Sequence, residues 1–526
     1  MRKTTPGGSF SGEERGKEAQ TPPPCLALHS PAQPRTRTKT KTKTLPAPAR
    51  LLLQINPQRS HHNSCLFRSF RLILRLENAI LSRNGAYAGE AELSIPDPYA
   101  PNYCSDPDCL VQHAQKWSHG VMTDLGTLPG VNLSSGATWV SSNGTIGGAS
   151  ENGRIDPLLG VPEIRAILWT KEGRMINLGT LDGGHESFVP AVNDREQVAG
   201  WALNTIPDPF SMTPCAIYAT CEPNSTQTRG FFWEHGLKRD LGTLGGPDAL
   251  PEAMNDRGQI IGWSYTSFSP NANNGYVCPP NVPTQDPFFW DKGEMVDIGT
   301  FGGTCGVAIF INNRGQVVGT SNLVGNQTHH AFLWDGGGLQ DIGTLGGMNA
   351  EADWISDSGL IVGRADVSMQ NTNHHAFLWK NGVMRDLGVV DPWPCSTALS
   401  VNSKGQVIGD TGICLVGGGP NFFSQDGQPM VDINTLVLPG SDLEIVDLFD
   451  INDRGEIAGG AVLPNGDEHA ILLVPASAEE IAAANNVNPS QTTSAATHTL
   501  IRSSENSVSS SGSRALNNLR QTQRLP

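Results

Sequence analysis

Short apolar segments alternate with polar turns along most of this chain, and four such segments recur in a fixed order. The first reads Asp-Leu-Gly-Thr-Leu, and copies of it begin at Asp124, Asn177, Asp240, Asp297, Asp341, Asp386 and Asp432. The second and third form a pair, as in residues 308–312 and 316–319, and the fourth reads Ala-Phe-Leu-Trp at residues 331–334. Each segment occurs seven times between residues 121 and 475, so this region is a repeat array.

The turns between these segments predict β-hairpins. A turn such as Asn-Asp-Arg-Gly at residues 452–455 joins two apolar runs, and an Asn or Asp followed by Gly supplies the positive φ that a tight hairpin requires. Two hairpins per repeat make a four-stranded antiparallel sheet. Seven such sheets predict an all-β fold, a seven-bladed β-propeller over residues 121–475, with a β-solenoid as the alternative.

The two ends of the array favour the propeller. The segment that begins at Asp124 has no preceding Trp strand, and the last Trp-type strand, residues 470–474, has no following partner. An open array would leave two bare strand edges, which natural sheets avoid. We therefore expect the strand at Asp124 to complete the last blade and close the ring.

Charge separates this array from its two flanks. Residues 1–90 contain 15 Lys and Arg against 5 Asp and Glu, whereas residues 91–474 contain 17 against 43. The acidic array is unsuited to nucleic acid, since phosphate binding needs clustered Lys and Arg. The basic region 1–90 and the Ser- and Asn-rich region 476–526 lack apolar periodicity, so we expect both to be disordered and to add nothing to stability. Residues 91–120 are interpreted as a lead-in segment.

Export signals in the sequence are ambiguous. No stretch of about 18 uncharged apolar residues is present, so no conventional transmembrane helix is expected. The one candidate signal region, residues 65–81, is interrupted by Arg68, Arg71 and Arg75, although residues 86–88 would suit a cleavage site.

The cysteines give a clearer indication of the compartment. Cys278 and Cys305 are equidistant from a predicted turn at residues 291–293, and Cys395 and Cys414 are equidistant from a turn at 403–405. Residues equidistant from a hairpin turn lie opposite one another, at a separation that suits a disulfide. The predicted bridges are Cys104–Cys109, Cys215–Cys221, Cys278–Cys305 and Cys395–Cys414. Four local pairs indicate an oxidising compartment, so we expect a periplasmic, extracellular or cell-surface protein.

Candidate binding residues lie in the long connections of the second and third repeats. Loops of variable length on a rigid scaffold commonly carry binding, and aromatic rings suit sugar faces or a protein partner. The candidates are Trp201, Phe210, Tyr218, Trp263, Tyr265 and Tyr276. The alternative is that these rings pack the inserts onto the propeller. The Trp repeated at residues 169, 233, 290, 334 and 379 is expected to pack between blades.

Catalytic and metal-binding patterns are weak. Two His-His pairs, at residues 329–330 and 374–375, recur at one repeat position, and no third ligand follows from their spacing. His185, Glu186 and Glu252 lie in or near the blade connections and are candidates for carboxylate chemistry. The sequence predicts no metal and no cofactor, and it leaves any catalytic residue unknown.

Two motifs resemble a known family. The triplets at residues 330–332 and 375–377 read His-Ala-Phe, and the Asp-Leu-Gly-Thr-Leu-Gly-Gly motif at residues 240–246 and 341–347 recurs in phase with them. This combination resembles the HAF repeat family of extracellular bacterial proteins over about residues 121–474. His is absent before Phe231 and Phe288, and Gly-Gly is lost after Asp386 and Asp432. The resemblance implies export and repeat structure, and it implies no activity.

These patterns lead to three candidate functions. The first is an exported, non-enzymatic scaffold that binds a glycan or a cell-surface protein through its long-loop face. The second is a polysaccharide hydrolase or lyase on a β-propeller, and the third is a structural surface protein without a discrete ligand. The sequence does not indicate an oligomeric state.

Overall fold

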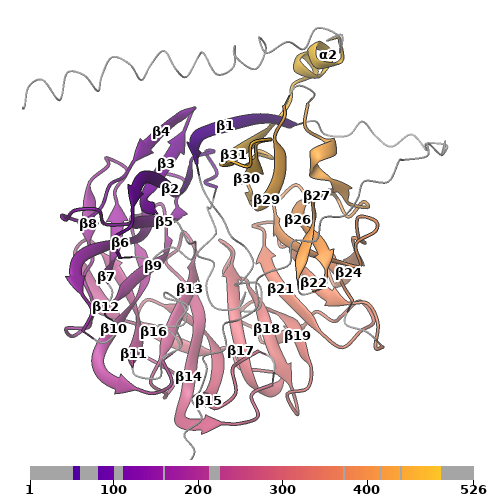
Figure 1. The fold of residues 1–526 in the computed structure, drawn as a ribbon. Coiled ribbons are helices and arrows are strands. Elements are labelled where there is room, and N and C mark those ends of the chain that lie inside the picture. The colour runs from indigo at the N-terminus through magenta and orange to yellow at the C-terminus, as the bar shows by residue number, and fades with distance from the viewer. Residues whose placement is uncertain are drawn as a thin grey trace, which may run out of the picture. The chain divides into compact units, whose positions relative to one another are not determined.

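The fold is an almost entirely β-stranded β-propeller, with sheets arranged around a common centre (Figure 1). The structure is a computed structural model. It describes residues 51–59, 81–99, 110–157, 160, 162–211, 225–275, 277–370, 373–414, 416–438 and 441–486. All of these belong to a unit that spans residues 49–526, and residues 1–48 form a second unit.

The described strands form eight antiparallel groups of three or four strands, here called sheet 1 to sheet 8 in chain order. One parallel pairing, of Gln285 with Cys305, joins sheets 4 and 5 into a continuous eight-stranded sheet. Sheet 1 has three strands, β2 (Tyr87–Pro96), β3 (Leu110–Ser118) and β4 (Val121–Asp124). Sheet 2 comprises β5 (Ser135–Val140), β6 (Ile146–Ile155), β7 (Pro162–Trp169) and β8 (Met175–Asn177), and sheet 3 comprises β9 (Ser187–Val192), β10 (Val198–Asp208), β11 (Ser225–Glu234) and β12 (Leu237–Asp240). Sheet 4 comprises β13 (Ala249–Met254), β14 (Ile260–Asn271), β15 (Val282–Asp291) and β16 (Glu294–Asp297).

Sheets 5 to 8 continue the same order. Sheet 5 comprises β17 (Gly302–Ile311), β18 (Val317–Leu323), β19 (His329–Trp334) and β20 (Leu339–Asp341), and sheet 6 comprises β21 (Ala350–Ile355), β22 (Ile361–Asp366), β23 (His374–Lys380) and β24 (Val383–Asp386). Sheet 7 comprises β25 (Cys395–Val401), β26 (Gln406–Ile413), β27 (Gly417–Gln425) and β28 (Val431–Asp432). Sheet 8 comprises β29 (Glu444–Ile451), β30 (Ile457–Val462), β31 (Glu468–Pro475) and β1 (Leu51–Arg59). Two short helices follow β28 and β31, namely η2 (Ile433–Thr435) and α2 (Ala478–Asn486).

Sheet 1 corrects both the predicted blade count and the predicted pairing of the strand at Asp124. That strand, β4, pairs with β3, where Gln115 lies opposite Asp124, and it does not pair with β31. The repeated motif did not identify β3, because residues 113–117 read His-Ala-Gln-Lys-Trp and lack the Phe of that motif. Among the described residues there are therefore eight sheets, where the sequence predicted seven.

An N-terminal strand does complete the last sheet, but it is β1. Leu52 pairs with Val474 and Leu53 pairs with Leu473, and Figure 1 shows indigo β1 beside β31. The boundaries predicted at residues 90 and 121 are thus too late, because β1 and the start of β2 lie within the region that was expected to be disordered. The predicted disorder from residue 476 is also wrong at α2.

Each sheet buries its side chains against its neighbours. Trp233 of sheet 3 packs with Ala166 and Leu168 of sheet 2, and Trp290 of sheet 4 packs with Ala191 of sheet 3. The recurrent Trp is buried in four of the five copies and partly buried in the fifth; the buried copies are Trp169, Trp233, Trp290 and Trp379. The packing role predicted for this Trp is confirmed.

A β-bulge recurs in the first strand of most sheets and explains the repeated Val-Gly. The pairing register shifts at Ala137/Trp139, Pro251/Ala253, Ala308/Phe310, Ala352/Trp354, Ala398/Ser400 and Leu448/Asp450. At the bulge of β17, the backbone comes so close to Gly319 that a Cβ there would collide with the carbonyl oxygen of Val307. Since a bulge also re-aims the side chain beside it, Trp139, Phe310 and Trp354 leave the alternation of their strands.

Two of the predicted disulfides lie among the described residues, and both are present. Cys395 and Cys414 bridge the β25–β26 hairpin with a Cα–Cα distance of 5.1 Å, so the predicted pairing within this hairpin is confirmed. The register differs from the prediction, because Gly412 lies opposite Cys395. Cys278 and Cys305 are 6.0 Å apart between Cα atoms, but they do not span the predicted β15–β16 hairpin. The other two predicted pairs, Cys104–Cys109 and Cys215–Cys221, lie outside the described residues.

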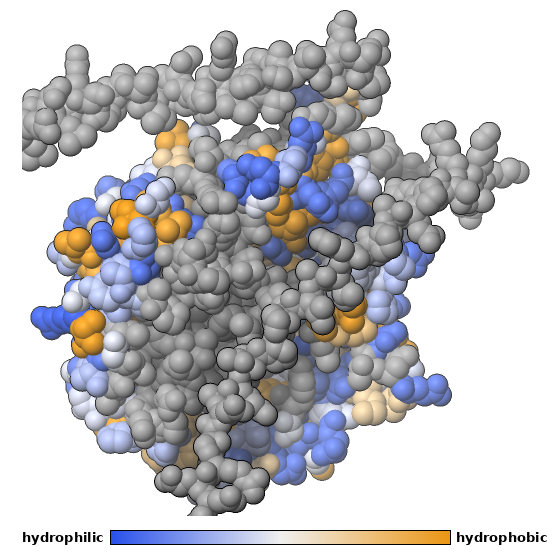
Figure 2. Space-filling model, in the orientation of Figure 1, coloured by the Kyte–Doolittle hydropathy of each residue, from blue (hydrophilic) through white to orange (hydrophobic). Residues whose placement is uncertain are grey.

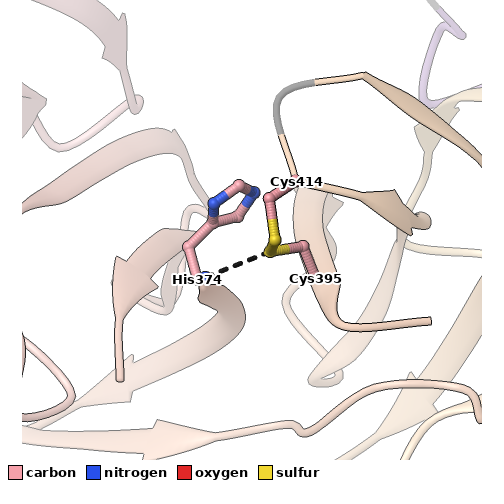
Figure 3. Close-up of side chains that lie close together, drawn as sticks. All are labelled: His374, Cys395 and Cys414. Carbon is pink, nitrogen blue, oxygen red and sulfur yellow. Dashed lines mark hydrogen bonds between the residues drawn. A yellow bond between two sulfur atoms is a disulfide. The ribbon is translucent and has the colours of Figure 1, made fainter. Parts of the chain in front are cut away.

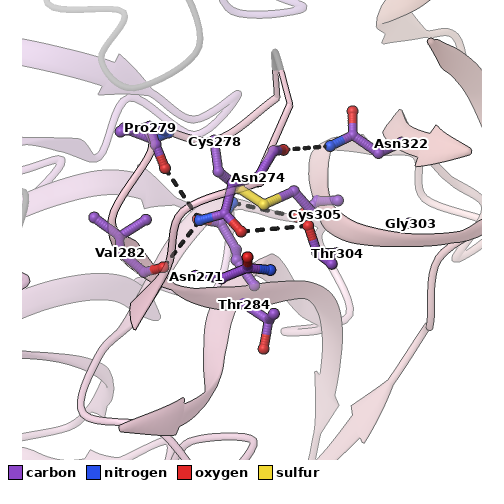
Figure 4. The surroundings of a disulfide bond; sticks show 12 residues. Asn271, Asn274, Cys278, Pro279, Val282, Thr284, Gly303, Thr304, Cys305 and Asn322 are labelled. Atoms are coloured by element: carbon purple, nitrogen blue, oxygen red, sulfur yellow. Dashed lines mark hydrogen bonds between the residues drawn. A yellow bond between two sulfur atoms is a disulfide. The ribbon is translucent and has the colours of Figure 1, made fainter. Parts of the chain in front are cut away.

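The Cys278–Cys305 bridge instead fastens the β14–β15 loop of sheet 4 to β17 of sheet 5 (Figure 4). Asn274 of this loop forms hydrogen bonds both to its own sheet and to the neighbouring sheet. Its Nδ2 donates to the carbonyl oxygen of Val282 at 2.9 Å, and its own carbonyl oxygen accepts from Nδ2 of Asn322 at 2.6 Å. The long connection is therefore anchored on the neighbouring sheet.

The visible surface shows no continuous apolar area. On the face drawn in Figure 2, hydrophobic residues form separate small groups among hydrophilic ones. No helix in the described part of the chain is long and apolar enough to cross a membrane.

Candidate functional site

In sheets 2 to 8 the turn between the first two strands hydrogen-bonds to the corresponding turn of the next sheet, and in sheet 1 the turn that precedes β2, residues 82–85, takes this place. Asn312 shows the arrangement: its Oδ1 accepts from the backbone N–H groups of Arg314 and Gln316, each at 3.0 Å. Its Nδ2 donates to the carbonyl oxygen of Ser356 in the next sheet at 3.0 Å. One side chain therefore shapes its own turn and joins two sheets.

Such contacts link all eight turns in succession. In four more links the Nδ2 group of an Asn donates to a backbone carbonyl oxygen of the next turn. These links run from Asn193 to Asn255, from Asn255 to Asn312, from Asn402 to Asn452, and from Asn452 to Ser82 of sheet 1. Neighbouring side chains supply the remaining links, Asn84 to Ser142, Asn143 to Asp194, and Ser358 to Ser403. The turn ring, as we call these eight turns, surrounds the centre of the propeller on the face opposite the long connections.

A cavity of about 170 Å³ lies inside the turn ring. Three aromatic side chains from the bulge positions line it. The rings of Phe310 and Trp354 stack with centroids 3.7 Å apart, and Trp139, from the far side of the axis, has its centroid 6.3 Å from that of Phe310. All three are partly exposed. A cluster of three aromatic rings therefore forms part of the cavity wall.

Carboxylates and one guanidinium surround the mouth of this cavity. In seven of the eight turns the second residue lines it: Arg83, Ser142, Asp256, Asn313, Asp357, Ser403 and Asp453. Arg83 crosses from sheet 1, and its Nη2 lies 2.7 Å from Oδ2 of Asp357 and 3.6 Å from Oδ2 of Asp256. Half of the Arg83 side chain remains exposed. The mouth therefore combines acidic acceptors with one cationic donor.

The chemistry of this lining suits binding. It offers planar aromatic faces together with amide and carboxylate groups, and among its described residues there is no His or Cys. We therefore treat this cavity, which we call the axial cavity, as the candidate binding site.

The aromatic residues predicted from the long connections lie elsewhere. Trp201 and Trp263 are each 2% exposed and Tyr265 is fully buried, and Phe210 is partly buried. Trp201 stacks on Phe188 with ring centroids 5.5 Å apart. These rings pack the interior here, so they present little surface to a ligand. Tyr218 and Tyr276 lie outside the described residues.

The structure places the predicted acid and His candidates in different environments. His185 pairs through Nδ1 with Glu163 at 2.7 Å, a partner that the sequence did not indicate. Burial acts to raise the pKa of Glu163, but hydrogen bonds from Asn152 and His185 and the charge of Arg165 lower it below its usual value. Glu186 is buried, and its Oε2 accepts from the backbone N–H of Ile164. Glu252 lies in β13, near the bulge.

The two His-His pairs divide into two environments. His330 and His375 face solvent and pair with Asp341 at 2.7 Å and Asp386 at 2.9 Å. Their predecessors are buried: His329 lies 3.2 Å from Glu351, and His374 lies beside the Cys395–Cys414 disulfide. Spacing alone missed this cluster, because Cys395 and Cys414 follow His374 at distances that match no short metal motif.

Comparisons with known proteins add little. No protein-family model matches the chain, and neither does any curated protein. The β-propeller domain of the Trilobed protease from Pyrococcus furiosus aligns with 66% of this chain and 91% of its own, at 9% identity and a TM-score of 0.37. Dipeptidyl peptidase 4 from Porphyromonas gingivalis aligns with 76% of this chain, at 9% identity and a TM-score of 0.40, and this chain spans 58% of that protein. These similarities are low, and the propeller assignment rests on the sheets themselves.

Proposed function

We propose that the protein is an exported, non-enzymatic binding protein of the HAF repeat type, and that its axial cavity holds one sugar ring of a glycan. The observation that carries the proposal is the partly exposed aromatic stack of Phe310 and Trp354 beside the polar turn ring. A sugar ring presents one apolar face to an aromatic side chain and directs its hydroxyl groups to amides and carboxylates at the edge.

The size of the cavity limits the ligand. Pockets for drug-sized molecules are about 300–1,000 Å³, whereas this cavity is about 170 Å³. It suits one ring-sized group, such as the terminal residue of a longer glycan that continues into solvent. A recessed site of this size favours a glycan end over a flat protein surface.

Two observations support an oxidising compartment. The described residues contain two disulfides, Cys278–Cys305 and Cys395–Cys414, and disulfides persist mainly in exported proteins. The bridge at Cys278 fixes a loop on a neighbouring sheet, which is a use suited to a permanent crosslink.

A glycan array with the full chain tests the proposal, followed by titration of the glycan that binds. Trp354→Leu keeps an apolar side chain but removes the flat ring, so we expect binding about tenfold weaker, which corresponds to about 1.4 kcal/mol. The matched control is Phe268→Leu, which alters an aromatic residue that is 63% exposed in the β14–β15 region of the opposite face and should leave binding unchanged.

Three outcomes would overturn the proposal. They are the absence of binding to any glycan, a loss of binding in Phe268→Leu with none in Trp354→Leu, and release of reducing ends from a bound polysaccharide. The second result would place the site on the long connections. The third would instead support a polysaccharide hydrolase.

A further inference from the structure

A second candidate site lies between sheets 6 and 7, away from the axial cavity. His374 begins β23, Cys395 begins β25, and Cys414 directly follows β26 (Figure 3). One ring nitrogen of His374 and the two sulfur atoms all lie within 4.8 Å of one another. His374 and Cys395 are buried, whereas Cys414 is partly exposed, so the cluster is accessible from one side.

Comparison with the preceding repeat shows what is special about this cluster. His329 occupies the position of His374, and its backbone N–H donates to Oδ1 of Asn349. In the next repeat, the backbone N–H of His374 donates to Sγ of Cys395 at 3.2 Å. The backbone hydrogen bond is thus made at the same position in both repeats. In the later repeat, the sulfur of Cys395 replaces the side-chain amide of Asn349, and Cys414 adds a second sulfur.

The other disulfide lacks this environment. In the part of the chain that the structure describes, the only group of three or more His, Cys, Asp or Glu residues with ligand atoms close enough to share a metal ion is His374, Cys395 and Cys414. Cys278 and Cys305 belong to no such group. The imidazole therefore distinguishes one disulfide from the other.

We propose that Cys395, Cys414 and His374 form a zinc site when the Cys395–Cys414 disulfide is reduced. Reduction by a dithiol transfers two electrons and two protons, breaks the S–S bond, gives two thiols, and converts the dithiol into its own disulfide. Zn²⁺ then binds both sulfur atoms as thiolates and releases two protons. Disulfide and metal are mutually exclusive, since each uses the same two sulfur atoms.

The donor set selects the metal. Two thiolates and one imidazole are soft ligands that favour Zn²⁺ over Ca²⁺ or Mg²⁺, which prefer oxygen. Three protein ligands leave one tetrahedral position for water or another small ligand, a number typical of open zinc sites. Because the backbone around His374 matches that around His329, its position does not depend on the disulfide alone.

Cobalt titration of the full chain tests this site. The protein is reduced with dithiothreitol under nitrogen, freed of reductant, and titrated with Co²⁺ as a spectroscopic substitute for zinc. We expect a thiolate-to-cobalt charge-transfer band that saturates at one ion per chain, disappears when Zn²⁺ is added, and is absent from the oxidised protein. Zn²⁺ should also protect Cys395 and Cys414 from alkylation.

Matched variants assign the ligands. His374→Gln should weaken Co²⁺ binding by at least about tenfold, since even outer-shell partners of metal ligands contribute this much. His329→Gln, the equivalent change one repeat earlier, should have no effect, and a Cys278→Ser/Cys305→Ser double variant should retain the band.

The proposal is wrong if reduced wild-type protein gives no band, or if His374→Gln binds as tightly as wild type. It is also wrong if the Cys278→Ser/Cys305→Ser variant loses the band while its circular dichroism remains native. Alkylation of both Cys395 and Cys414 at an equal rate with and without Zn²⁺ would contradict it independently of any variant.

Discussion

Replacing Asp286 should stabilise the protein at alkaline pH, because a second carboxyl group, that of Asp297, faces it. In four sheets a His or Arg in the strand before the last pairs with an Asp eleven residues later; the pairs are His113–Asp124, Arg229–Asp240, His330–Asp341 and His375–Asp386. Sheet 4 has Asp286 at the position of the His or Arg, facing Asp297. Two carboxyl groups therefore meet where those sheets pair an Asp with a His or an Arg.

The size of the effect follows from the pKa of Asp286. Burial, then the charge of Asp297 and a hydrogen bond with it, raise this pKa to about 6. A shift of about two units corresponds to at most ~3 kcal/mol. Asp286 is only partly buried and Asp297 is exposed, so solvent screening reduces the repulsion. We expect about 1 kcal/mol from Asp286→Asn.

The sign depends on pH. The folded protein holds the proton of Asp286 more tightly than the unfolded chain does, so stability is lost as pH rises from about 4 to about 6 and stays lower above that. Asp286→Asn should therefore raise the melting temperature by about 2 °C at pH 8 and leave it unchanged at pH 4. Asp286→His should do the same at pH 8 and stabilise further near pH 6, where the imidazolium pairs with Asp297.

Differential scanning calorimetry between pH 4 and pH 8 measures these shifts. The control is Asp386→Asn: burial acts to raise the pKa of Asp386, but the hydrogen bond with His375 outweighs it and lowers the pKa. That variant should lose stability at pH 6 instead of gaining it. A gain for Asp286→Asn that is equal at pH 4 and pH 8, or no gain at pH 8, would refute the reasoning.

Two further predictions concern the last sheet and a buried ion pair. Deletion of residues 1–60 removes β1 and exposes the edge of β31, so it should lower the free energy of unfolding by roughly 3 kcal/mol or more in urea titrations. Deletion of residues 1–48 keeps β1 and should leave the free energy of unfolding unchanged. Equal tolerance of both deletions would contradict the β1–β31 pairing. Burial acts to raise the pKa of Glu351, but Arg364 at 2.7 Å and His329 hold it at about 2, so Glu351→Gln should cost about 3 kcal/mol at pH 7 by removing the carboxylate that pairs with Arg364. That cost should shrink as pH falls towards 2, and a cost independent of pH would contradict it.

Local patterns predicted much of this fold. The order of the four segments, the Gly turns and the cross-hairpin pairing of Cys395 with Cys414 all depend on residues close in sequence, and the structure has them. The 278–305 pairing was correct for a different reason, since Cys305 meets its partner from the next sheet. Symmetry about a turn does not distinguish a partner within a hairpin from one across two sheets.

The eighth sheet was missed because its motifs have diverged. Residues 82–85 form the same turn as residues 312–315, with the N–H of Gly85 donating to the carbonyl oxygen of Ser82, but Ser82 replaces the usual Asn. In β3, Gln115 replaces the usual Phe. The pair His113 and Asp124 preserves the spacing of the other His–Asp pairs, and this spacing was the signal that could have revealed the sheet.

Sequence patterns could not predict the axial cavity, and the reason is geometric. Trp139 and Phe310 belong to sheets 2 and 5, and they meet only because bulges aim both side chains at the axis. Which residues face each other across the axis depends on the number of sheets, a global property. The predicted count of seven, over residues 121–475, left Arg83 outside the ring.

The residues of each turn in the turn ring have different roles, and this explains how a repeated structure can still form a specific site. The first residue of each turn is Asn or Ser. Where it is Asn, its side chain hydrogen-bonds the next sheet, as Asn312 shows, whereas in the Ser turns a neighbouring residue makes this contact. In seven of the eight turns the second residue lines the cavity mouth, and there it varies among Arg, Ser, Asp and Asn. Arg83 reaches Asp256 and Asp357, which flank the turn directly opposite it in a ring of eight. Repetition thus fixes the frame through hydrogen bonds between neighbouring turns, in which second residues such as Asn313 and Asp357 also take part. Because the second residue varies from turn to turn, it determines which groups the cavity mouth presents to a ligand.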